Sequence, residues 1–437
     1  MEWYWMLLII LGGLVLLLLT GMPLGFSFLF ITLVLILFLW GGGPGLLQII
    51  HTLESNLTKF ILLPVPLFIL MGEVIFHSGI APKMIDAIDK WIGGLPGRLG
   101  LLAVSSGTLL ATLTGASMAS FAILGSTLTP EMEKRGYKKP MSLGPILGSG
   151  GLAIMIPPSA LAVYLGALAE ISIGKILMGI IFPGFLMAVL YATYIVLRCK
   201  FQPAIAPKYE VSHIPLSEKL SATAKYILPV GFIIFLVIGV ILLGIATPSE
   251  AAATGAVGTY LLAAAYGRLN WNVIKKSLSS GFYVTMMVFT ILIGAYSFTQ
   301  LLTFSGAGRG MIEFITTLPI HPILIFIAVQ LFGLVLGMFM VPTGVMSIIV
   351  PLFMPLLAIM GFDPIWFAVV LMLNVEMGTT SPPFGHGLYV MRGVAPRDTT
   401  MGDIYRSALP FLGCDLIAMA LIIAFPQICL WLPTAMR

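Results

Sequence analysis

The stretch GSGGLAIMIPPS, residues Gly148 to Ser159, places two adjacent glycines and two adjacent prolines inside a strongly apolar segment. An internal glycine costs a helix about 1 kcal/mol and an internal proline about 3 kcal/mol. Pro157 and Pro158 also lack the backbone N–H that a continuous helix would use. Such a break survives at membrane depth only where protein or a water-filled cavity covers it. The stretch therefore predicts a helix that is interrupted inside a membrane protein.

The composition of the chain indicates that lipid surrounds much of it. Of its 437 residues, 59% are hydrophobic and 9% are charged, and the mean hydropathy is +1.08. Soluble domains carry about 25% charged residues, so this chain has too little charge to solvate a globule of its size. The predicted fold is an all-α, polytopic membrane protein with about ten transmembrane helices of ~20 residues and two re-entrant hairpins. The expected spans cover 4–20, 24–40, 58–77, 140–170, 173–198, 226–245, 249–266, 280–302, 363–391 and 407–433.

The basic residues predict how the chain is oriented. If the N-terminus lies outside and the segments 98–132 and 321–360 each enter and leave by one face, 18 of the 22 Lys and Arg residues fall on one side. The other four are Lys59, Lys175, Arg309 and Arg437. Cytoplasmic loops carry such an excess, so we expect both termini in the periplasm. Orientation then explains the net charge of +5, and no nucleic-acid binding is needed.

The two halves of the chain match in order. Pro23 and Pro248 are 225 residues apart, and so are the pairs Pro157-Pro158 and Pro382-Pro383. Two matches lie between them, Ser78-Gly79 with Ser305-Gly306 and Thr114-Gly115 with Thr343-Gly344. An odd number of spans separates the copies, so they should be inverted, and inverted repeats with interrupted segments are typical of secondary transporters. We expect a first copy at 1–200, a cytoplasmic linker at 201–225 and a second copy at 226–437.

The breaks supply groups that a continuous apolar helix lacks. Unwound backbone offers carbonyls to a cation, and the N-terminus of a half-helix attracts an anion. We expect Gly150 and Gly151 to let the helix unwind, and the hairpin tips to approach the breaks from opposite faces. Neutral oxygens without a carboxylate cage suit Na⁺; here they belong to Thr114, Ser117, Ser149, Thr343, Thr379 and Thr380. Gly and Pro are common in membrane helices, so a single break could be a structural kink; the pairing of breaks and tips favours a site.

Few ionisable residues lie near these segments, and such residues inside a membrane are often functional. Glu376 directly precedes the second break and either shapes a cation site or serves the helix end. His386 follows that break, as a proton carrier or as a hydrogen-bonded structural residue. Glu250 begins a helix, where its carboxylate complements the N-terminal dipole. The amphipathic segment 80–97, with Trp91 as an anchor, is expected to lie along the membrane surface as a scaffold helix. Weaker candidates are Glu73, His77 and Asp415.

Four stretches carry a family resemblance. They are the hairpin tip TGASM from Thr114, GSGGLAIMIPPSALAVYLG from Gly148, FMVPTGVMSIIVPLFMPLL from Phe339 and NVEMGTTSPPFGHGLYVMRG from Asn374. Together they resemble the large membrane subunit of tripartite ATP-independent periplasmic (TRAP) transporters, a family of the ion-transporter superfamily. The resemblance covers nearly the whole chain. Thr114 stands where that family's serine-rich SGS pattern would begin, and Met118 replaces a smaller residue.

The resemblance implies a Na⁺-coupled importer of organic acids in the bacterial inner membrane, and no enzyme. It implies an elevator, in which hairpins and broken helices slide together against a scaffold. A small four-helix membrane subunit would brace the scaffold within the membrane lipid, and a periplasmic binding protein would deliver the substrate. We expect substrate at Ser117, Ser149, Gly150, Pro157, Pro158, Ser159, Thr380, Ser381, Pro382 and Pro383. We expect Na⁺ at Thr114, Gly115, Ser117, Gly151, Thr343, Gly344, Glu376, Gly378 and Thr379.

Three other functions compete with this interpretation. A symporter for divalent anions and Na⁺ could share the architecture and work without a binding protein. An intramembrane enzyme would need a catalytic pair at depth, and the sequence has no H-E-x-x-H pattern, paired intramembrane aspartates or Ser/His couple. A channel could use the hairpins, but matched broken helices fit an occluding carrier better. The breaks and tips contain no arginine, so dicarboxylates, keto acids, sugar acids and sulfonates all stay open as substrates.

Overall fold

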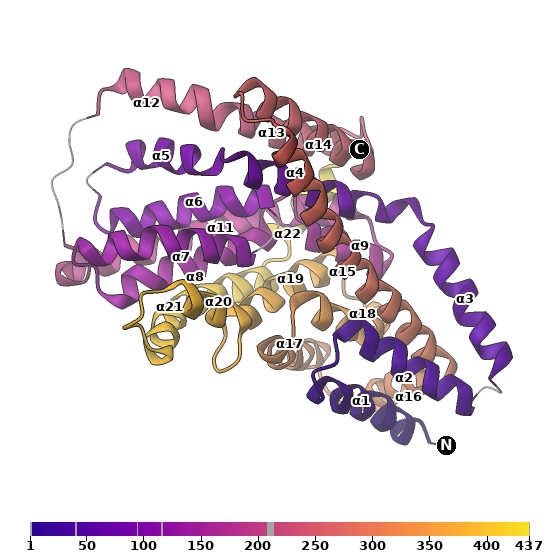
Figure 1. The fold of residues 1–437 in the computed structure, drawn as a ribbon. Coiled ribbons are helices and arrows are strands. Elements are labelled where there is room, and N and C mark those ends of the chain that lie inside the picture. The colour runs from indigo at the N-terminus through magenta and orange to yellow at the C-terminus, as the bar shows by residue number, and fades with distance from the viewer. Residues whose placement is uncertain (1, 40–41, 94, 115–116, 208–213, 437) are drawn as a thin grey trace.

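The computed structural model describes the backbone of residues 2–39, 42–93, 95–114, 117–207 and 214–436, and their side chains except those of 39 and 111–119. Every regular element in this part of the chain is a helix, as the sequence predicts. Seven helices are long and apolar enough to cross a membrane, and the bent pair α8–α9 would make an eighth. The described chain is therefore an all-α, polytopic membrane protein (Figure 1).

The first half contains the predicted hairpin as α6–α7 and the predicted broken helix as α8–α9. Its elements are α1 (Trp3–Leu19), α2 (Leu24–Leu39), α3 (Gly43–Leu57), η1 (Phe60–Leu62), α4 (Pro64–Ser78), α5 (Ala81–Ile92), α6 (Arg98–Thr114), α7 (Ser117–Lys134), α8 (Lys139–Met155), α9 (Ala160–Ala169), α10 (Ile173–Gly179), α11 (Ile181–Phe201) and η2 (Pro203–Ile205).

The second half repeats this order, with its hairpin as α17–α18 and its broken helix as α19–α20. Its elements are α12 (Leu216–Ala222), the π-helical turn η3 (Thr223–Ile227), α13 (Leu228–Leu242), α14 (Pro248–Ala265), α15 (Trp271–Phe304), α16 (Ala307–Thr317), α17 (Pro322–Phe339), α18 (Pro342–Ile359), α19 (Pro364–Thr380), α20 (His386–Val394), α21 (Met401–Ala424) and α22 (Gln427–Ala435).

Local sequence signals explain where many of these helices begin. Proline stands in the first turn of α4, α14, α17, α18 and α19, where a helix has no intrahelical use for an N–H. Thr247 and Glu250 form a reciprocal capping box at the start of α14, which confirms the helix-end role predicted for Glu250. Thr400 and Asp403 form the same motif at the start of α21.

Three of the described α-helices lie outside every predicted span, hairpin and surface helix, namely α3, α16 and the short α12 within the predicted linker. Of these, α3 and α16 are amphipathic and interspersed with polar residues. Uniform hydrophobicity does not identify such helices, because they are stabilised by packing one apolar face against the rest of the protein. The predicted surface helix is α5, and Trp91 donates a hydrogen bond from Nε1 to Thr223 Oγ1 at 2.7 Å.

The two halves interleave in space. Helix α4 of the first half packs against α14 of the second half, and α15 of the second half packs against α2 of the first. The broken helix α8 contacts the hairpin helices α6 and α7 on one side and α19 and α21 of the second half on the other. From Met141 to Met155 every residue of α8 is buried, and so is every residue of α19 from Ile365 to Thr380. The two interrupted helices are thus the most enclosed elements of the described fold.

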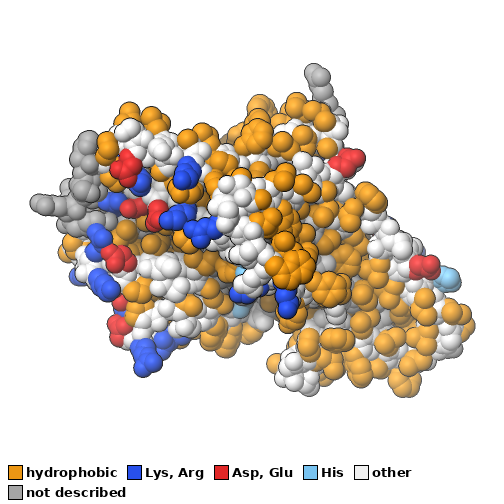
Figure 2. All heavy atoms as spheres, turned by 45° about the horizontal axis from the view of Figure 1, so that its top comes forward, with side chains coloured by type: hydrophobic (Ala, Val, Ile, Leu, Met, Phe, Trp, Pro, Cys, Tyr) orange, Lys and Arg blue, Asp and Glu red, His pale blue; other side chains and the backbone are white. Residues whose placement is uncertain are grey.

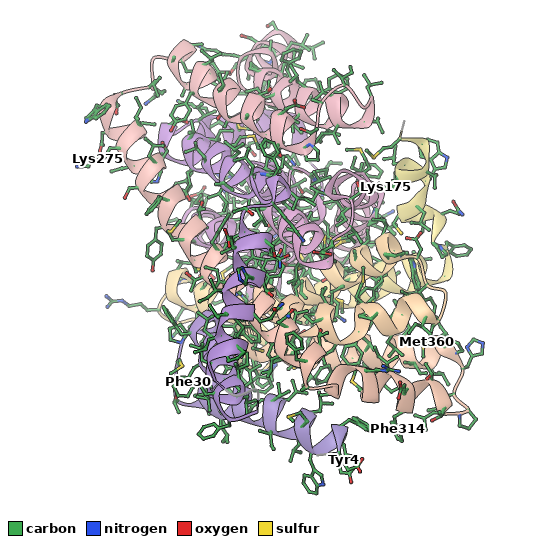
Figure 3. All side chains as sticks on the ribbon, turned by 90° about the vertical axis from the view of Figure 1, so that its right-hand side faces the viewer. Tyr4, Phe30, Lys175, Lys275, Phe314 and Met360 are labelled. Carbon is green, nitrogen blue, oxygen red and sulfur yellow. The ribbon has the colours of Figure 1, made fainter. Side chains whose placement is uncertain are left out.

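Charged and apolar side chains separate on the surface. In Figure 2 the Lys and Arg side chains gather on the left part of the molecule, and the right part of that face is largely hydrophobic. Both chain ends in Figure 1 lie away from the left edge. At the N-terminal end, Tyr4 of α1 and Phe314 of α16 are exposed side by side at one edge (Figure 3). The separation agrees with the predicted asymmetry, and the assignment of the basic side to the cytoplasm stays a prediction.

Candidate functional site

The first break separates α8 from α9 by four residues. Ile156 and Ser159 are extended, and the helix axes on either side of them differ by 46°. The Ser159 side chain caps α9 by accepting a hydrogen bond from the Ala162 N–H at 3.3 Å. Pro157 and Pro158 are buried, and the peptide bond between them is cis. This break is therefore enclosed by protein, as non-helical backbone at membrane depth has to be.

The glycines before this break have a different role from the predicted one. Both belong to α8, which continues to Met155, so the helix does not unwind at Gly150 and Gly151. A Cβ atom at Gly150 would lie 1.9 Å from Cε1 of Phe121, and one at Gly151 would lie 3.2 Å from Oε1 of Glu376. The glycines make room for these two side chains, and the unwinding falls five residues later, where the prolines lack N–H groups.

The second break separates α19 from α20 by five residues. Ser381 is extended, Pro382 is half-buried and Pro383 is exposed. Here too the Pro–Pro peptide bond is cis. No side chain caps the N-terminus of α20 at Gly385, so its first backbone N–H groups have no side-chain acceptor from the cap residue. The Tyr405 hydroxyl donates a hydrogen bond to the Pro383 carbonyl at 2.8 Å, which ties the break to α21.

Three hydroxyls in a row end α19, and each one donates to the preceding turn. Thr379 Oγ1 lies 2.8 Å from the Glu376 carbonyl, and Ser381 Oγ lies 2.7 Å from the Met377 carbonyl. Thr380 Oγ1 lies 3.4 Å from that same carbonyl. Because their hydrogens point back into the helix, the oxygen lone pairs are left to accept or to coordinate. Ser149 behaves likewise in α8, where its hydroxyl donates to the Ile146 carbonyl at 2.9 Å.

Glu376 lies between the two broken helices. The residue is 1% exposed, and its Oε1, 3.2 Å from Thr379 Oγ1, shares the hydrogen that this hydroxyl donates to the Glu376 carbonyl. It belongs to α19 and lies against Gly151 of α8. Among the described residues no three His, Cys, Asp or Glu side chains are close enough to share a metal ion. A cation held here would therefore depend on neutral oxygens and one carboxylate.

Phe121 joins the two breaks and has no counterpart among the sequence-predicted residues. It belongs to α7, the second arm of the first hairpin, and is fully buried. A Cβ at Gly150 would collide with its ring, and a Cβ at Gly387 of α20 would lie 2.7 Å from its Cε2. One aromatic ring thus packs on the helix before the first break and on the helix after the second. The sequence signal for this contact was the presence of Gly150 and Gly387, since a glycine inside a buried helix often marks the close approach of another group.

The second hairpin docks on the first break in turn. Ser347 of α18 and Tyr164 of α9 share a hydrogen bond between their hydroxyl oxygens at 2.5 Å, with both side chains buried. Ser347 also donates to the carbonyl of Thr343, one turn earlier. At the tip itself Thr343 and Gly344 are buried, and a Cβ at Gly344 would lie 2.5 Å from Leu24 of α2. Each hairpin therefore contacts the half-helix that follows the break of the other copy.

Three predicted site residues cannot be placed in this geometry. Gly115 lies outside the described residues. Thr114 and Ser117 end α6 and begin α7, and their side chains lie outside the description. The remaining predicted glycine, Gly378, marks a backbone contact with α17, because a Cβ there would lie 2.6 Å from the Gly337 Cα.

A weaker candidate also lies near the site. Asp415 of α21 is 3% exposed and accepts a hydrogen bond from the Tyr191 hydroxyl of α11. It interacts electrostatically with Glu376, so α21 contributes an acidic residue to the surroundings of the broken helices. Glu73 and His77, by contrast, pair with each other on α4 at 3.2 Å.

Comparisons with known proteins agree with this architecture. Residues 11–428 match the family described as tripartite ATP-independent periplasmic transporter, DctM component. The chain is 30% identical over 377 residues to the C4-dicarboxylate TRAP transporter large permease protein DctM of Pseudomonas aeruginosa, covering 86% of each protein. It is 29% identical to the ectoine TRAP transporter large permease protein TeaC of Halomonas elongata, covering 90% of this chain and 91% of that protein. The crystal structure of the YdaH transporter of Alcanivorax borkumensis shares the fold with a TM-score of 0.58 at 15% identity, covering 88% of this chain and 90% of that one. The chain belongs to the DctM component family of the tripartite ATP-independent periplasmic transporters, and it is a large membrane subunit of that kind.

Proposed function

We propose that this subunit carries an organic acid across the bacterial inner membrane together with Na⁺. The observation that carries the proposal is the pair of broken helices: α8 and α19 are buried up to their breaks, and the half-helix after each break is contacted by the hairpin of the other copy. Interrupted helices at matching positions of two inverted copies are where secondary transporters bind substrate and ion. The matching element order supports the two predicted copies, 1–200 and 226–437.

The ion would bind among neutral oxygens beside Glu376. The hydroxyls of Thr379 and Thr380 donate back into α19, so their lone pairs could accept or coordinate, and Thr343 would contribute from the tip of the second hairpin. Small hard cations prefer oxygen ligands of this type. Thr114, Gly115 and Ser117 would contribute from the other tip, and Gly344 from the second hairpin. Gly151 makes room for the Glu376 side chain, and Gly378 lets α19 approach the backbone of Gly337. Na⁺ would enter as coupling ion and cargo.

The substrate would bind as a carboxylate at the ends of half-helices. C4-dicarboxylates and ectoine, named in the two relatives, both contain a carboxylate group. Backbone N–H groups at the N-termini of α9, α18 and α20 attract negative charge, and none of these helices places an acidic residue in its first turn. Ser149, Ser159 and Ser381 supply hydroxyls close to the Pro–Pro breaks.

Transport would proceed by an elevator movement of the hairpins and broken helices against a scaffold built on α2, α4, α14 and α15. The lengthwise packing of α4 on α14 and of α15 on α2 supports a rigid scaffold of that kind. We propose that a small four-helix membrane subunit braces it. A periplasmic binding protein would deliver the substrate to the face that carries few basic residues, where both termini would lie.

The decisive experiment measures Na⁺ binding without any substrate. A ligand that binds only the folded chain stabilises it by RT ln(1 + [L]/Kd), so NaCl should raise the unfolding temperature in detergent while equal KCl should not. The Glu376→Gln variant should need more Na⁺ for the same rise. Equal effects of NaCl and KCl would overturn the Na⁺ assignment and would favour Glu376 and His386 as proton carriers.

A second experiment separates the proposal from a stand-alone symporter of divalent anions. Uptake of the organic acid is measured in proteoliposomes under an inward Na⁺ gradient. The proteoliposomes contain this subunit, with or without its small subunit and binding protein. Uptake that requires the binding protein supports the tripartite mechanism. Uptake by this chain alone supports the stand-alone symporter.

A further inference from the structure

A basic cavity lies at the charged end of the scaffold, far in sequence from either break. Its volume is about 250 Å³, and it is lined by Gly79, Ile80, Lys83, Lys225, Tyr226, Ala265, Tyr266 and Arg268. At roughly 30 Å³ per water molecule, this space equals about eight waters and exceeds what a single ion needs. Its lining comes from the ends of α4 and α14, the start of α5 and the turn η3.

Within the described residues, the three cations of this cavity have no acidic partner. None of the described lining residues is acidic, and none of Lys83, Lys225 and Arg268 forms an ion pair within the described part of the chain. Their neighbours differ: Lys90 pairs with Glu218 at 2.6 Å, and Arg98 pairs with Asp89 at 2.7 Å. Three like charges held around one cavity repel each other, and an anion between them would relieve that repulsion.

The surroundings of the cavity have the character of a lipid headgroup layer. Tyr226 and Tyr266 lie with ring centroids 5.9 Å apart, and Lys225 lies 5.5 Å from the Tyr226 ring centroid. Aromatic side chains with a polar tip are enriched at this level of a membrane. Immediately along α13 from Tyr226, the exposed apolar side chains Leu228, Phe232 and Phe235 offer a surface to acyl chains.

We infer that the cavity binds the phosphate of an anionic phospholipid, with its acyl chains along α13. Basic pockets between membrane helices on the cytoplasmic side recognise such headgroups. A free phosphate ion could satisfy the same three cations, but it would make no use of the adjoining apolar face. The lipid would hold the end of the scaffold where α4, α13 and α14 meet.

The test uses the full-length chain in a neutral detergent. Native mass spectrometry measures the binding of phosphatidylglycerol and of phosphatidylcholine to the parent and to a Lys83→Gln, Lys225→Gln, Arg268→Gln variant. The matched control is Lys200→Gln, Lys275→Gln, Lys276→Gln, which removes the same charge from exposed side chains outside the cavity; Lys275 points away from the molecule (Figure 3). We expect the cavity variant to lose roughly tenfold or more of its phosphatidylglycerol affinity, and the control to lose little.

Three results would overturn the inference. The first is a parent that binds the two lipids equally, and the second is an equal loss in both variants, which indicates general surface charge. The third is that millimolar inorganic phosphate displaces the lipid and binds the lipid-free chain as tightly as phosphatidylglycerol does. That result would assign the cavity to the free ion. If the triple variant unfolds at a lower temperature than the control, Lys225→Gln alone replaces it, since the hydrogen bond from Tyr266 goes to the Lys225 backbone carbonyl and is kept.

Discussion

The two Pro–Pro breaks use the same backbone chemistry in different surroundings. At the first, both prolines are buried, Ser159 caps the following helix, and Gly184 of α11 lies so close to the Met155 carbonyl that a Cβ there would be 2.2 Å from its oxygen. At the second, Pro383 and Phe384 are exposed, the following helix has no side-chain cap, and Glu376 lies one turn before the break. The first break is closed by protein, and the second retains open hydrogen-bonding capacity and a carboxylate.

The comparison shows that the same Pro–Pro motif in the two copies does not build the same kind of site. Proline creates the same gap in both helices, because the missing N–H is a local property. What fills the gap is decided by neighbours from other helices, and these differ between the copies. We therefore expect the second break to contribute more to ion binding and the first to contribute more to holding the bundle together.

The largest effect is expected from closing the breaks. Replacing Pro382 and Pro383 by alanine removes about 3 kcal/mol of helix penalty per residue, enough to favour a continuous helix by roughly a hundredfold or more. Na⁺-driven uptake in proteoliposomes should fall steeply while membrane insertion stays normal. The same change at Pro157 and Pro158 should also reduce uptake but should shift the Na⁺ requirement less. Pro351→Ala with Pro355→Ala is the control, because both prolines lie inside α18 without a break. Equal Na⁺ requirements in the parent and both break variants would make the breaks structural.

Phe121 tests whether the two breaks share one support. Phe121→Ala removes a ring that contacts both Gly150 and Gly387, and a cavity of that size costs on the order of 3 kcal/mol. We expect a marked drop in unfolding temperature in detergent, together with weaker Na⁺ stabilisation. Phe411→Ala is the matched control, since its ring packs on Gly144 and Gly148 of α8 and on Tyr191 and Tyr194 of α11. If both variants lose Na⁺ stabilisation equally, the link through Phe121 is not specific.

Glu376 sharpens the assignment of the ion to the second break. Glu376→Gln keeps the shape and removes a charge a few ångströms from the proposed ion, so the half-maximal Na⁺ concentration should rise roughly tenfold or more. Ser149→Ala, which alters the helix before the first break, should change the half-maximal Na⁺ concentration by less. The measurement is the thermal shift against NaCl for the two variants, and a larger change for Ser149→Ala would reverse the ranking of the breaks.

A smaller effect is expected where the second hairpin contacts the first break. Tyr164→Phe removes one hydroxyl from the buried pair with Ser347 and leaves the ring in place. A buried hydrogen bond of this kind contributes about 1 kcal/mol. The unfolding temperature should fall slightly, and Tyr164→Phe with Ser347→Ala should lose less stability than the sum of the losses in the two single variants. Additive losses in that double-mutant cycle would show that the pair is not coupled.

The smallest effect is expected from an ion-pair cluster that joins the start of α8 to the loop after α20. Lys139, at the start of α8, contacts Asp398 after α20 and Glu133 in the last turn of α7, each at 2.9 Å. The hydrogen bond from Lys139 holds the pKa of Asp398 below its ordinary value. Its stabilising contribution is therefore present above the ordinary Asp pKa of about 4 and is lost as the pH falls through the lowered value. The difference in unfolding temperature between the parent and Asp398→Asn should be small at pH 7 and should vanish in acid, and a difference that grows in acid would contradict this.

Much of the architecture could be predicted because it depends on local chemistry and on the solvent. Apolar runs indicate membrane helices, the basic residues indicate orientation, and Pro157-Pro158 and Pro382-Pro383 indicate breaks without reference to any partner. Glu250 could be assigned to a helix start because a carboxylate complements the N-terminal dipole, and the structure shows it in a capping box with Thr247. The helices α3 and α16 could not be predicted this way, since an amphipathic helix becomes stable only against the surface it packs on.

The sequence by itself determined where the backbone cannot stay helical, since a missing N–H acts wherever the chain goes. Only the tertiary structure decided what lies beside those gaps. Gly150 and Gly151 proved to be helical positions that admit Phe121 and Glu376, and the hydroxyl pair of Tyr164 and Ser347 joins residues 183 apart in the chain. Such contacts depend on side chains from distant segments meeting at van der Waals distance, and no local pattern encodes which segments meet.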